Sequence, residues 1–204
     1  MRKPGPTPEQ VASATGGRKT RGCSKKLDAA ITTAAWRLLA SYGPAGVSID
    51  AVARDVGCAR SSIYRRFPTK ESLITEAART HFGLPPSPEG GSLLDWIATT
   101  RAASFGEPAS VLAITLLMGE AVRGTEMGRR YLDEVIGPIR LQRTELLTKA
   151  ISNGEIQADT DISLLQDIIV GALLFRIAHH PEPEEDLGRR ITAMLFDGVR
   201  PRPG

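Results

Sequence analysis

Guanidinium and hydroxyl side chains are concentrated in residues 59–67, in a pattern that suits contact with a nucleic acid. Arginine can donate two parallel hydrogen bonds to a guanine, and serine and tyrosine hydroxyls can bind phosphate oxygens. Ala59, Ile63 and Phe67 stand four residues apart, so on a helix they share a buried face and leave the polar side chains outside. These polar side chains are Arg60, Ser61, Ser62, Tyr64, Arg65 and Arg66. The pattern therefore indicates an exposed helix that contacts a polyanion.

A second short helix and a tight turn are expected just before this segment. Ser48 is a good N-cap for a helix that runs to Asp55, and Gly57 supplies the turn that follows. Pro68 ends the helix of residues 59–67, because proline cannot continue a helix. Two short helices joined in this way form a helix-turn-helix, in which the second helix reads DNA.

A further helix begins directly after Pro68. Thr69 is its expected N-cap, with Ser72 in the position where a full capping box has Glu. Lys70 then lies beside free backbone amides at the start of a helix, where a phosphate can be held. The sequence thus places a second phosphate-binding group close to the helix of residues 59–67.

At this point residues 25–75 resemble the DNA-binding part of the TetR family of bacterial transcriptional repressors. The string Ile-Tyr-x-x-Phe-x-x-Lys-Glu-x-Leu, from Ile63 to Leu73, is highly specific to that family. Pro44 departs from the family pattern, which bears on the shape of the local loop. The other matching residues are Ala34, Ala35, Leu38, Leu39, Gly43, Val47, Ser48, Ile49, Ala53, Val56, Gly57 and Ser62.

The resemblance implies roles for individual residues and for the rest of the chain. It implies phosphate contacts by Ser48, Tyr64 and Lys70. It implies base or backbone contacts by Arg60, Ser61 and Arg65, and Ser62 is a further DNA-binding candidate on the same helix. It also implies a homodimer on a double-stranded DNA operator, with C-terminal helices that form a small-molecule pocket and a dimerisation surface.

Charge and composition divide the chain into three expected parts. Residues 1–24 hold almost no large apolar side chain and are expected to be a flexible basic arm. The DNA-binding domain is expected at residues 25–75 and the effector-binding and dimerisation domain at 76–204. Residues 1–82 carry 14 Lys and Arg against 6 Asp and Glu, whereas residues 83–204 carry 12 against 17. This asymmetry favours a polyanion partner for the N-terminal part alone.

Apolar residues recur with a helical period along the rest of the chain, and no two-residue period is sustained. The fold class is therefore all-α: a three-helix DNA-binding domain followed by a helical C-terminal domain. The long helix is expected to kink at Gly137-Pro138. The expected helices cover residues 25–42, 48–55, 59–67, 69–82, 93–105, 109–122, 125–152, 161–178 and 184–199.

Apolar and aromatic residues of the middle helices could line an effector pocket, although core packing alone explains each of them separately. Methionine suits adaptable sites. Glu120, with Arg123 three residues later, could supply a polar group there or form an ion pair within its helix. The effector-binding candidates are Trp96, Phe105, Leu112, Leu116, Met118, Glu120, Met127, Tyr131 and Phe175. The effector is expected to be largely apolar.

The helix of residues 161–178 has two apolar faces, so it is expected to be covered from two sides. One side can be the domain core and the other a partner subunit, although a larger intrachain core would give the same pattern. The dimerisation candidates are Leu164, Ile168, Gly171, Phe175, Ile191 and Leu195.

Two rival functions are left open. One is a dimeric DNA-binding protein without a small effector. The other is a small helical metal hydrolase that uses the cluster from His179 to Asp186, although its adjacent histidines would point in different directions on a helix. No catalytic motif accompanies the cluster, so no enzyme, metal site or cofactor is expected. No apolar run is long enough to cross a membrane and no secretory signal is recognised, so a cytoplasmic protein is expected.

The basic residues of the arm generate a prediction about salt dependence. Deleting residues 1–22 should flatten the plot of log affinity against log salt by about 0.9 for each lost phosphate contact, because fewer counterions are released. Site preference should stay largely intact. The measurement is a salt titration of operator binding by the full-length and shortened chains, and an equal slope for both would show that the arm makes no such contacts.

Overall fold

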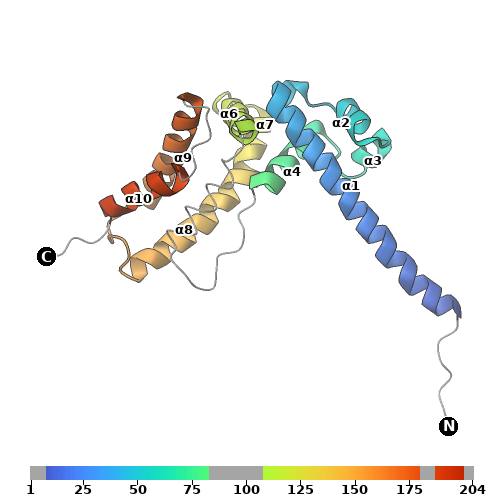
Figure 1. Cartoon of the computed structure of the whole chain (residues 1–204), viewed down its shortest axis with the longest axis horizontal. Coiled ribbons are helices and arrows are strands. Elements are labelled where there is room, and N and C mark those ends of the chain that lie inside the picture. Colours follow the sequence, from blue (N-terminus) through green and yellow to red (C-terminus); the bar gives the residue numbers. More distant parts are fainter. Residues whose placement is uncertain (1–7, 83–107, 180–186, 200–204) are drawn as a thin grey trace, which may run out of the picture.

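Helices account for most of the residues that the structure describes. The computed structural model describes residues 8–82, 108–179 and 187–199, and it contains no strand within these ranges (Figure 1). The all-α prediction is therefore confirmed. The elements are α1 (Pro8–Gly46), α2 (Ile49–Val56), α3 (Arg60–Tyr64), α4 (Lys70–Phe82), α6 (Pro108–Val122), α7 (Glu126–Tyr131), the π-helical turn η1 (Leu132–Ile136), α8 (Gly137–Ser152), α9 (Ile162–His179) and α10 (Leu187–Val199).

The first helix is much longer than the sequence suggested. It begins at Pro8, so the expectation of a flexible arm over residues 1–24 is wrong from Pro8 onward. Once the packed part of α1 has formed a helix, each further residue adds one hydrogen bond at little cost, so the helix extends backwards through polar sequence. At its other end, Gly43 adopts φ 70°, a left-handed conformation that glycine tolerates, and the chain continues through Pro44 to Gly46.

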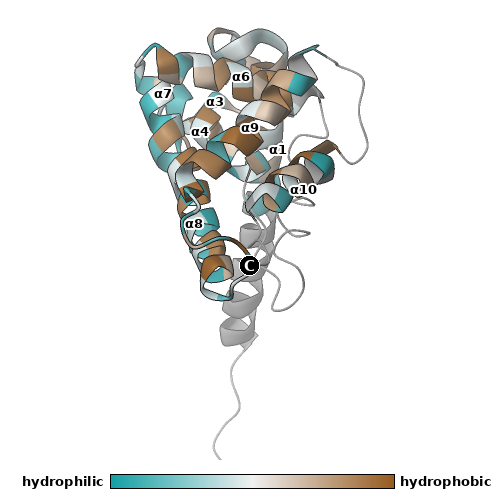
Figure 2. Cartoon of the chain, turned by 90° about the vertical axis from the view of Figure 1, so that its left-hand side faces the viewer, coloured by the Kyte–Doolittle hydropathy of each residue, from teal (hydrophilic) through white to brown (hydrophobic). Residues whose placement is uncertain are grey.

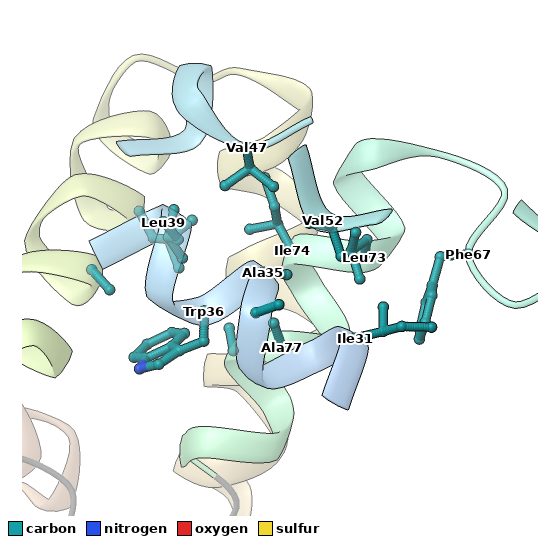
Figure 3. Close-up of a cluster of buried hydrophobic side chains, with 14 of the residues drawn as sticks. Ile31, Ala35, Trp36, Leu39, Val47, Val52, Phe67, Leu73, Ile74 and Ala77 are labelled. Carbon is teal, nitrogen blue, oxygen red and sulfur yellow. The ribbon is translucent and has the colours of Figure 1, made fainter. Parts of the chain in front are cut away.

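The core of the DNA-binding domain is built where α1 and α4 pack together. Ile31, Ala35 and Leu39 of α1 are fully buried, as are Leu73, Ile74 and Ala77 of α4. Figure 3 shows these side chains facing one another, with Val52 of α2 and Phe67 packed at their side. Because successive buried residues are three or four apart, each helix presents a continuous apolar stripe. Helices α2 and α3 are fixed to this pair through Val52 and Ile63, both fully buried.

Side-chain caps fix the starts of α2 and α4. The amide of Ala51 donates to the Ser48 hydroxyl at 3.1 Å, as expected of an N-cap. The amide of Ser72 donates to Oγ1 of Thr69 at 3.0 Å, and the amide of Thr69 donates to Oγ of Ser72 at 3.2 Å. Thr69 and Ser72 therefore form a reciprocal capping box with serine in place of glutamate.

The predicted long helix of residues 125–152 is interrupted. Its N-cap is Thr125, whose hydroxyl accepts from the amide of Gly128, but the α-helix changes to the π-helical turn η1 before α8 begins. The kink expected at Gly137-Pro138 thus takes the form of a widened turn just before it. Pro138 has no amide to donate to Glu134, and its ring would clash with that carbonyl in a regular α-helix, so a wider turn relieves the conflict.

Two clusters of buried apolar residues hold the chain together. The larger joins α1 to α4 with α6, α7 and η1, so the DNA-binding helices and the start of the C-terminal part share one core. The smaller joins α8, α9 and α10 around Leu147, Leu173 and Phe196. Helix α4 crosses the expected domain boundary at residue 75 without a break. The helix expected at residues 93–105 lies outside the described residues.

The capping box of α4 gives a stability prediction. Thr69→Ala should lower the free energy of unfolding by about 1 kcal/mol, because it leaves a helix-start amide without its acceptor. Thr80→Ala is the matched control, since the exposed Thr80 hydroxyl only donates back to the carbonyl of Glu76 within the helix. Urea unfolding of both variants measures the difference. Equal losses would mean that the box does not stabilise α4.

Candidate nucleic-acid interface and ligand cavity

The turn between α2 and α3 depends on one glycine. Gly57 ends α2 with φ 71° and ψ 35°, and the amide of Cys58 donates to the carbonyl of Ala53 at 3.0 Å. This left-handed residue closes α2 and starts α3 within a few residues. Ile63 is buried beneath α3, whereas Tyr64 on its outer side is 52% exposed. Helices α2 and α3 lie together beside α1 (Figure 1), as a helix-turn-helix requires.

A polar depression gathers residues from the starts of α2, α3 and α4. Four predicted DNA-binding residues line it, and they come from positions far apart in the sequence. Two helix N-termini border it, and their free amides and positive dipole ends favour a phosphate. The lining residues are Ser48, Ile49, Asp50, Arg60, Tyr64, Pro68, Thr69 and Lys70. The arrangement therefore offers hydroxyl, guanidinium and ammonium groups to one stretch of phosphate backbone.

Two cationic groups of this depression, those of Arg60 and Lys70, already interact with other residues of the chain. Arg60 is paired with Asp50, and both side chains are largely exposed, so solvent and salt weaken the pair. The ammonium group of Lys70 donates to the carbonyl of Pro44 at 3.3 Å. A phosphate would replace the Asp50 contact with a stronger charge-assisted bond.

Arg66 has a structural position instead. Its guanidinium pairs with Asp28 of α1, donates to the Ser62 carbonyl at 2.8 Å and donates to the Ser24 hydroxyl at 3.1 Å. Only 15% of its side chain is exposed. Arg66 therefore ties the end of α3 to α1.

The remaining DNA-binding candidates lie on α3 and at its end, outside the depression. Ser61 and Arg65 are exposed, and Ser62 is half-buried. Arg65 follows the last residue of α3, because the helix ends at Tyr64 rather than at Phe67 as expected. Its side chain makes no hydrogen bond or ion pair with the described residues, so its guanidinium can reach a base edge without first breaking a contact.

A cavity of about 330 Å³ lies where α4, α6, α7 and η1 meet α8 and α9. Such a volume is at the small end of the range for ligand pockets, and most of its wall is apolar. The lining residues are Phe82, Ile114, Met118, Tyr131, Ile136, Ile139, Arg140, Arg143, Asp167, Val170, Gly171 and Leu174. Burial raises the pKa of the Tyr131 hydroxyl, so it stays protonated and can donate a hydrogen bond.

Three charged residues line this otherwise apolar cavity. Arg140 is paired with Asp167 and donates to the Ser163 hydroxyl at 2.8 Å. Arg143 is only 9% exposed, and within the described chain its guanidinium makes no hydrogen bond or ion pair. Burial, and then the nearby charge of Arg140, lower the pKa of Arg143 to about 10. Arg143 therefore remains charged at neutral pH, with no partner among the described residues.

Of the predicted effector residues that the structure describes, two line the cavity, Met118 and Tyr131. Met127 belongs to the core, and Leu116 lies against Gly43 of α1. Leu112 and Phe175 are 47% and 68% exposed. Trp96 and Phe105 lie outside the described residues.

The polar group of the cavity also differs from the one expected. Glu120 accepts from the Thr125 hydroxyl at 2.7 Å and pairs with Arg123 at 3.1 Å, so the predicted ion pair is confirmed, although Arg123 lies just beyond the end of α6. The charged residues at the cavity are instead Arg140, Arg143 and Asp167. A signal for Arg143 was present in the sequence, because it stands four residues after Ile139 and four before Leu147, on the apolar stripe of its helix.

The predicted dimerisation residues are divided among three environments. Leu164 and Ile168 of α9 are 54% and 41% exposed, and Phe175 lies further along the same helix. Figure 2 views the molecule from the side of α8, α9 and α10, where hydrophobic segments of α9 are visible. Ile191 and Leu195 are half-buried against the smaller core, and Gly171 lines the cavity.

Of the residues considered for a metal site, His179 is the one that the structure describes. It is exposed at the end of α9, where its ring stacks on Phe175 with centroids 4.1 Å apart. Its Nδ1 lies 3.0 Å from the carbonyl of Phe175. Residues 180–186 are outside the described ranges. Among the described helices, none has the length and apolar character needed to cross a membrane.

The fold and the polar face together define a helix-turn-helix DNA-binding protein. Comparison with known proteins agrees. Residues 31–77 match the model described as bacterial regulatory proteins of the tetR family, and residues 90–195 match the model of a tetracyclin repressor-like C-terminal domain. The chain belongs to the TetR family and is a DNA-binding transcriptional regulator.

Individual relatives match over most of their length. An uncharacterized HTH-type transcriptional regulator of Bacillus subtilis, YdeS, is 29% identical over 84% of this chain and 88% of its own. The DNA-binding transcriptional repressor TetR of Mycobacteroides abscessus is 28% identical over 85% of this chain and 94% of its own. A solved TetR-family structure from Rhodococcus sp. shares the fold, with a TM-score of 0.67 and 16% identity over 85% of this chain and 96% of that one.

Arg65, which is exposed and has no partner among the described residues, generates the prediction for this interface. Arg65→Ala should weaken specific binding by about 1–3 kcal/mol if its guanidinium reads a base edge. Arg79→Ala is the control, since Arg79 is equally a surface arginine but is paired with Glu76 on α4. Gel shifts with specific and scrambled duplexes measure the effect. Unchanged binding after combined replacement of Arg60, Tyr64 and Arg65 would rule out α3 as the reading helix.

Proposed function

We propose that this chain is a homodimeric repressor that a small effector releases from its DNA operator. The repressor named TetR in Mycobacteroides abscessus supports the direction of regulation. The polar depression supplies the DNA contacts, and the cavity between α4, α6, α8 and α9 supplies a place for the effector.

The observation that carries this proposal is the path of α4. The helix begins at Lys70, which lines the polar depression, and ends at Phe82, which lines the cavity. Its length of 13 residues spans about 18–20 Å. Between these ends, Leu73, Ile74 and Ala77 are packed against α1 without exposed surface. A displacement at Phe82 is therefore passed along a rigid, packed helix to the DNA-binding face.

The C-terminal end of α4 is also coupled to α1. The ring of Trp36 meets Phe82 edge to face, with centroids 4.9 Å apart, and stacks on His81 at 4.6 Å. Aromatic pairs in these geometries contribute about 0.5–1.5 kcal/mol each beyond the burial of their surface, so they hold α1 and α4 together at this end. A ligand that touches Phe82 would therefore shift both helices that carry the helix-turn-helix.

The effector can act only through its different affinities for the DNA-bound and released conformations. Coupling of this kind typically amounts to about 1–3 kcal/mol, which changes DNA affinity by about 5–150-fold. The cavity favours an effector-regulated repressor over a DNA-binding dimer without an effector. A purely structural core would fill such a space with side chains.

The exposed apolar side chains of α9 and α10 support a dimer. Leu164 and Ile168 lie near Met194 of α10 along one shallow groove, and Met194 is 77% exposed. Large exposed apolar side chains gathered in one place are costly in water and mark an interaction surface. A two-fold pairing of this surface would present two reading helices to one duplex.

The proposal is tested by selecting bound duplexes from random DNA. A roughly palindromic site should emerge, because a two-fold dimer contacts two equivalent half-sites. Leu164→Glu with Ile168→Glu should be monomeric in light scattering and should lose at least about tenfold in operator affinity, because two charges cannot be buried between subunits. Failure to enrich any duplex would argue against operator binding by this chain.

The control for this double variant is Val122→Glu. Val122 is 86% exposed on α6, away from the groove, so its replacement should leave both mass and affinity unchanged. A double variant that remains dimeric with full affinity would show that the subunits meet elsewhere.

A further inference from the structure

The buried guanidinium of Arg143 restricts the chemistry of the effector, if the chain is regulated as proposed above. An arginine removed from water without a partner costs several kcal/mol, and natural cores avoid this arrangement. Arg143 nevertheless lines the cavity with only 9% of its surface exposed, and its N–H donors make no hydrogen bond or ion pair with the described residues. Such a group is poised to bind an anion that comes from outside the chain.

The neighbouring charges fix how much negative charge the site can neutralise. Arg140 also faces the cavity, but it is already paired with Asp167 and hydrogen-bonded to Ser163. The three charged lining residues thus carry a net charge of +1. A ligand with one negative charge neutralises this net charge. A dianion would bring a second negative charge that no lining residue compensates in an apolar cavity.

The rest of the wall determines the body of the ligand. Met118, Ile139, Val170 and Leu174 are apolar side chains from three helices, α6, α8 and α9. They suit a hydrocarbon or aromatic group that leaves water. The volume of about 330 Å³ limits that group to a small one.

We infer that the cavity binds a small monocarboxylic acid, with its apolar body against α6 and α9 and its carboxylate on Arg143. Planar guanidinium and carboxylate groups form two parallel hydrogen bonds, so Arg143 sets the orientation of the acid as well as its charge. Tyr131, at the same cavity, can donate a further hydrogen bond from its protonated hydroxyl. The wall thereby discriminates an acid from an alcohol or amide of the same size.

The experiment measures binding by calorimetry on the full chain without DNA. The probes are octanoate, decanoate and benzoate, and each is compared with the neutral amide of the same acid. Decyl phosphate is the probe that carries a doubly charged head group. The acids should bind at least about tenfold more tightly than their amides, and Arg143→Met should remove about 10–100-fold of that affinity. Arg123→Gln is the matched control, because Arg123 is paired with Glu120 outside the cavity. It should bind the acids as the wild type does.

A second readout separates a ligand-binding arginine from a structural one. In the absence of ligand, Arg143→Met should raise the Tm by about 2–4 °C, since an unpaired buried charge is replaced by an apolar side chain of similar length. A lowered Tm would make Arg143 a structural residue and overturn the inference. Equal affinity for acids and amides, tighter binding of decyl phosphate, or an Arg143→Met variant that binds acids normally would overturn it as well.

Operator binding is measured separately on the same preparations. If the wild type binds its operator but none of the acids, the inference is wrong while regulation by DNA binding is unaffected. If the acids bind but leave operator affinity unchanged, the acid site is correct and the proposed release mechanism is wrong.

Discussion

The packing of α4 against α1 supports every other feature of this protein. Fully buried residues at helical spacing, such as Ile31 and Leu39 on α1 with Leu73 and Ala77 on α4, lock the two helices together. Helices α2 and α3 are held to this pair by Val52 and Ile63. Because a close-packed interface moves as a unit, the position of α3 on DNA depends on the position of α4. The same helix forms part of the cavity wall, so the DNA face and the cavity are mechanically linked.

Arginine serves three distinct purposes here, and burial distinguishes them. Arg66 and Arg37 pair with Asp28 and Asp55, and these pairs tie the helix-turn-helix to α1. Arg65 is exposed and has no partner among the described residues, so its guanidinium is available to DNA. Arg143 is buried beside the cavity, where burial has lowered its pKa to about 10 while leaving it charged. The sequence alone does not distinguish these arginines. Their burial and their ion-pair partners in the folded chain give each of them a different role.

The cavity lies beside the larger hydrophobic core, against the helices α8 and α9 that also carry the smaller one. The larger core contains α1, α4, α6 and α7, and the smaller contains α8, α9 and α10. The wall draws residues from the larger core, such as Phe82 and Tyr131, and is completed by residues of α8 and α9. A ligand that contacts α8 and α9 at this wall can shift them relative to the larger core, and small shifts of packed helices are a common route between two conformations. The π-helical turn η1 and α8 run from the first core to the second, so the same segment that carries Arg143 also joins them.

The amino-acid sequence by itself determined the helices, the helix-turn-helix and its family, because these follow from local signals. Ser48, Gly57 and Thr69 act on neighbouring backbone groups, and the apolar period of each helix is read directly from residue types. The helical extension of α1 to Pro8 was missed, since it depends on propagation from a packed segment rather than on local composition. Only the tertiary structure decided which side chains line the cavity. Met118, Tyr131 and Arg143 come from different helices, and their convergence depends on packing distances that no single helix encodes.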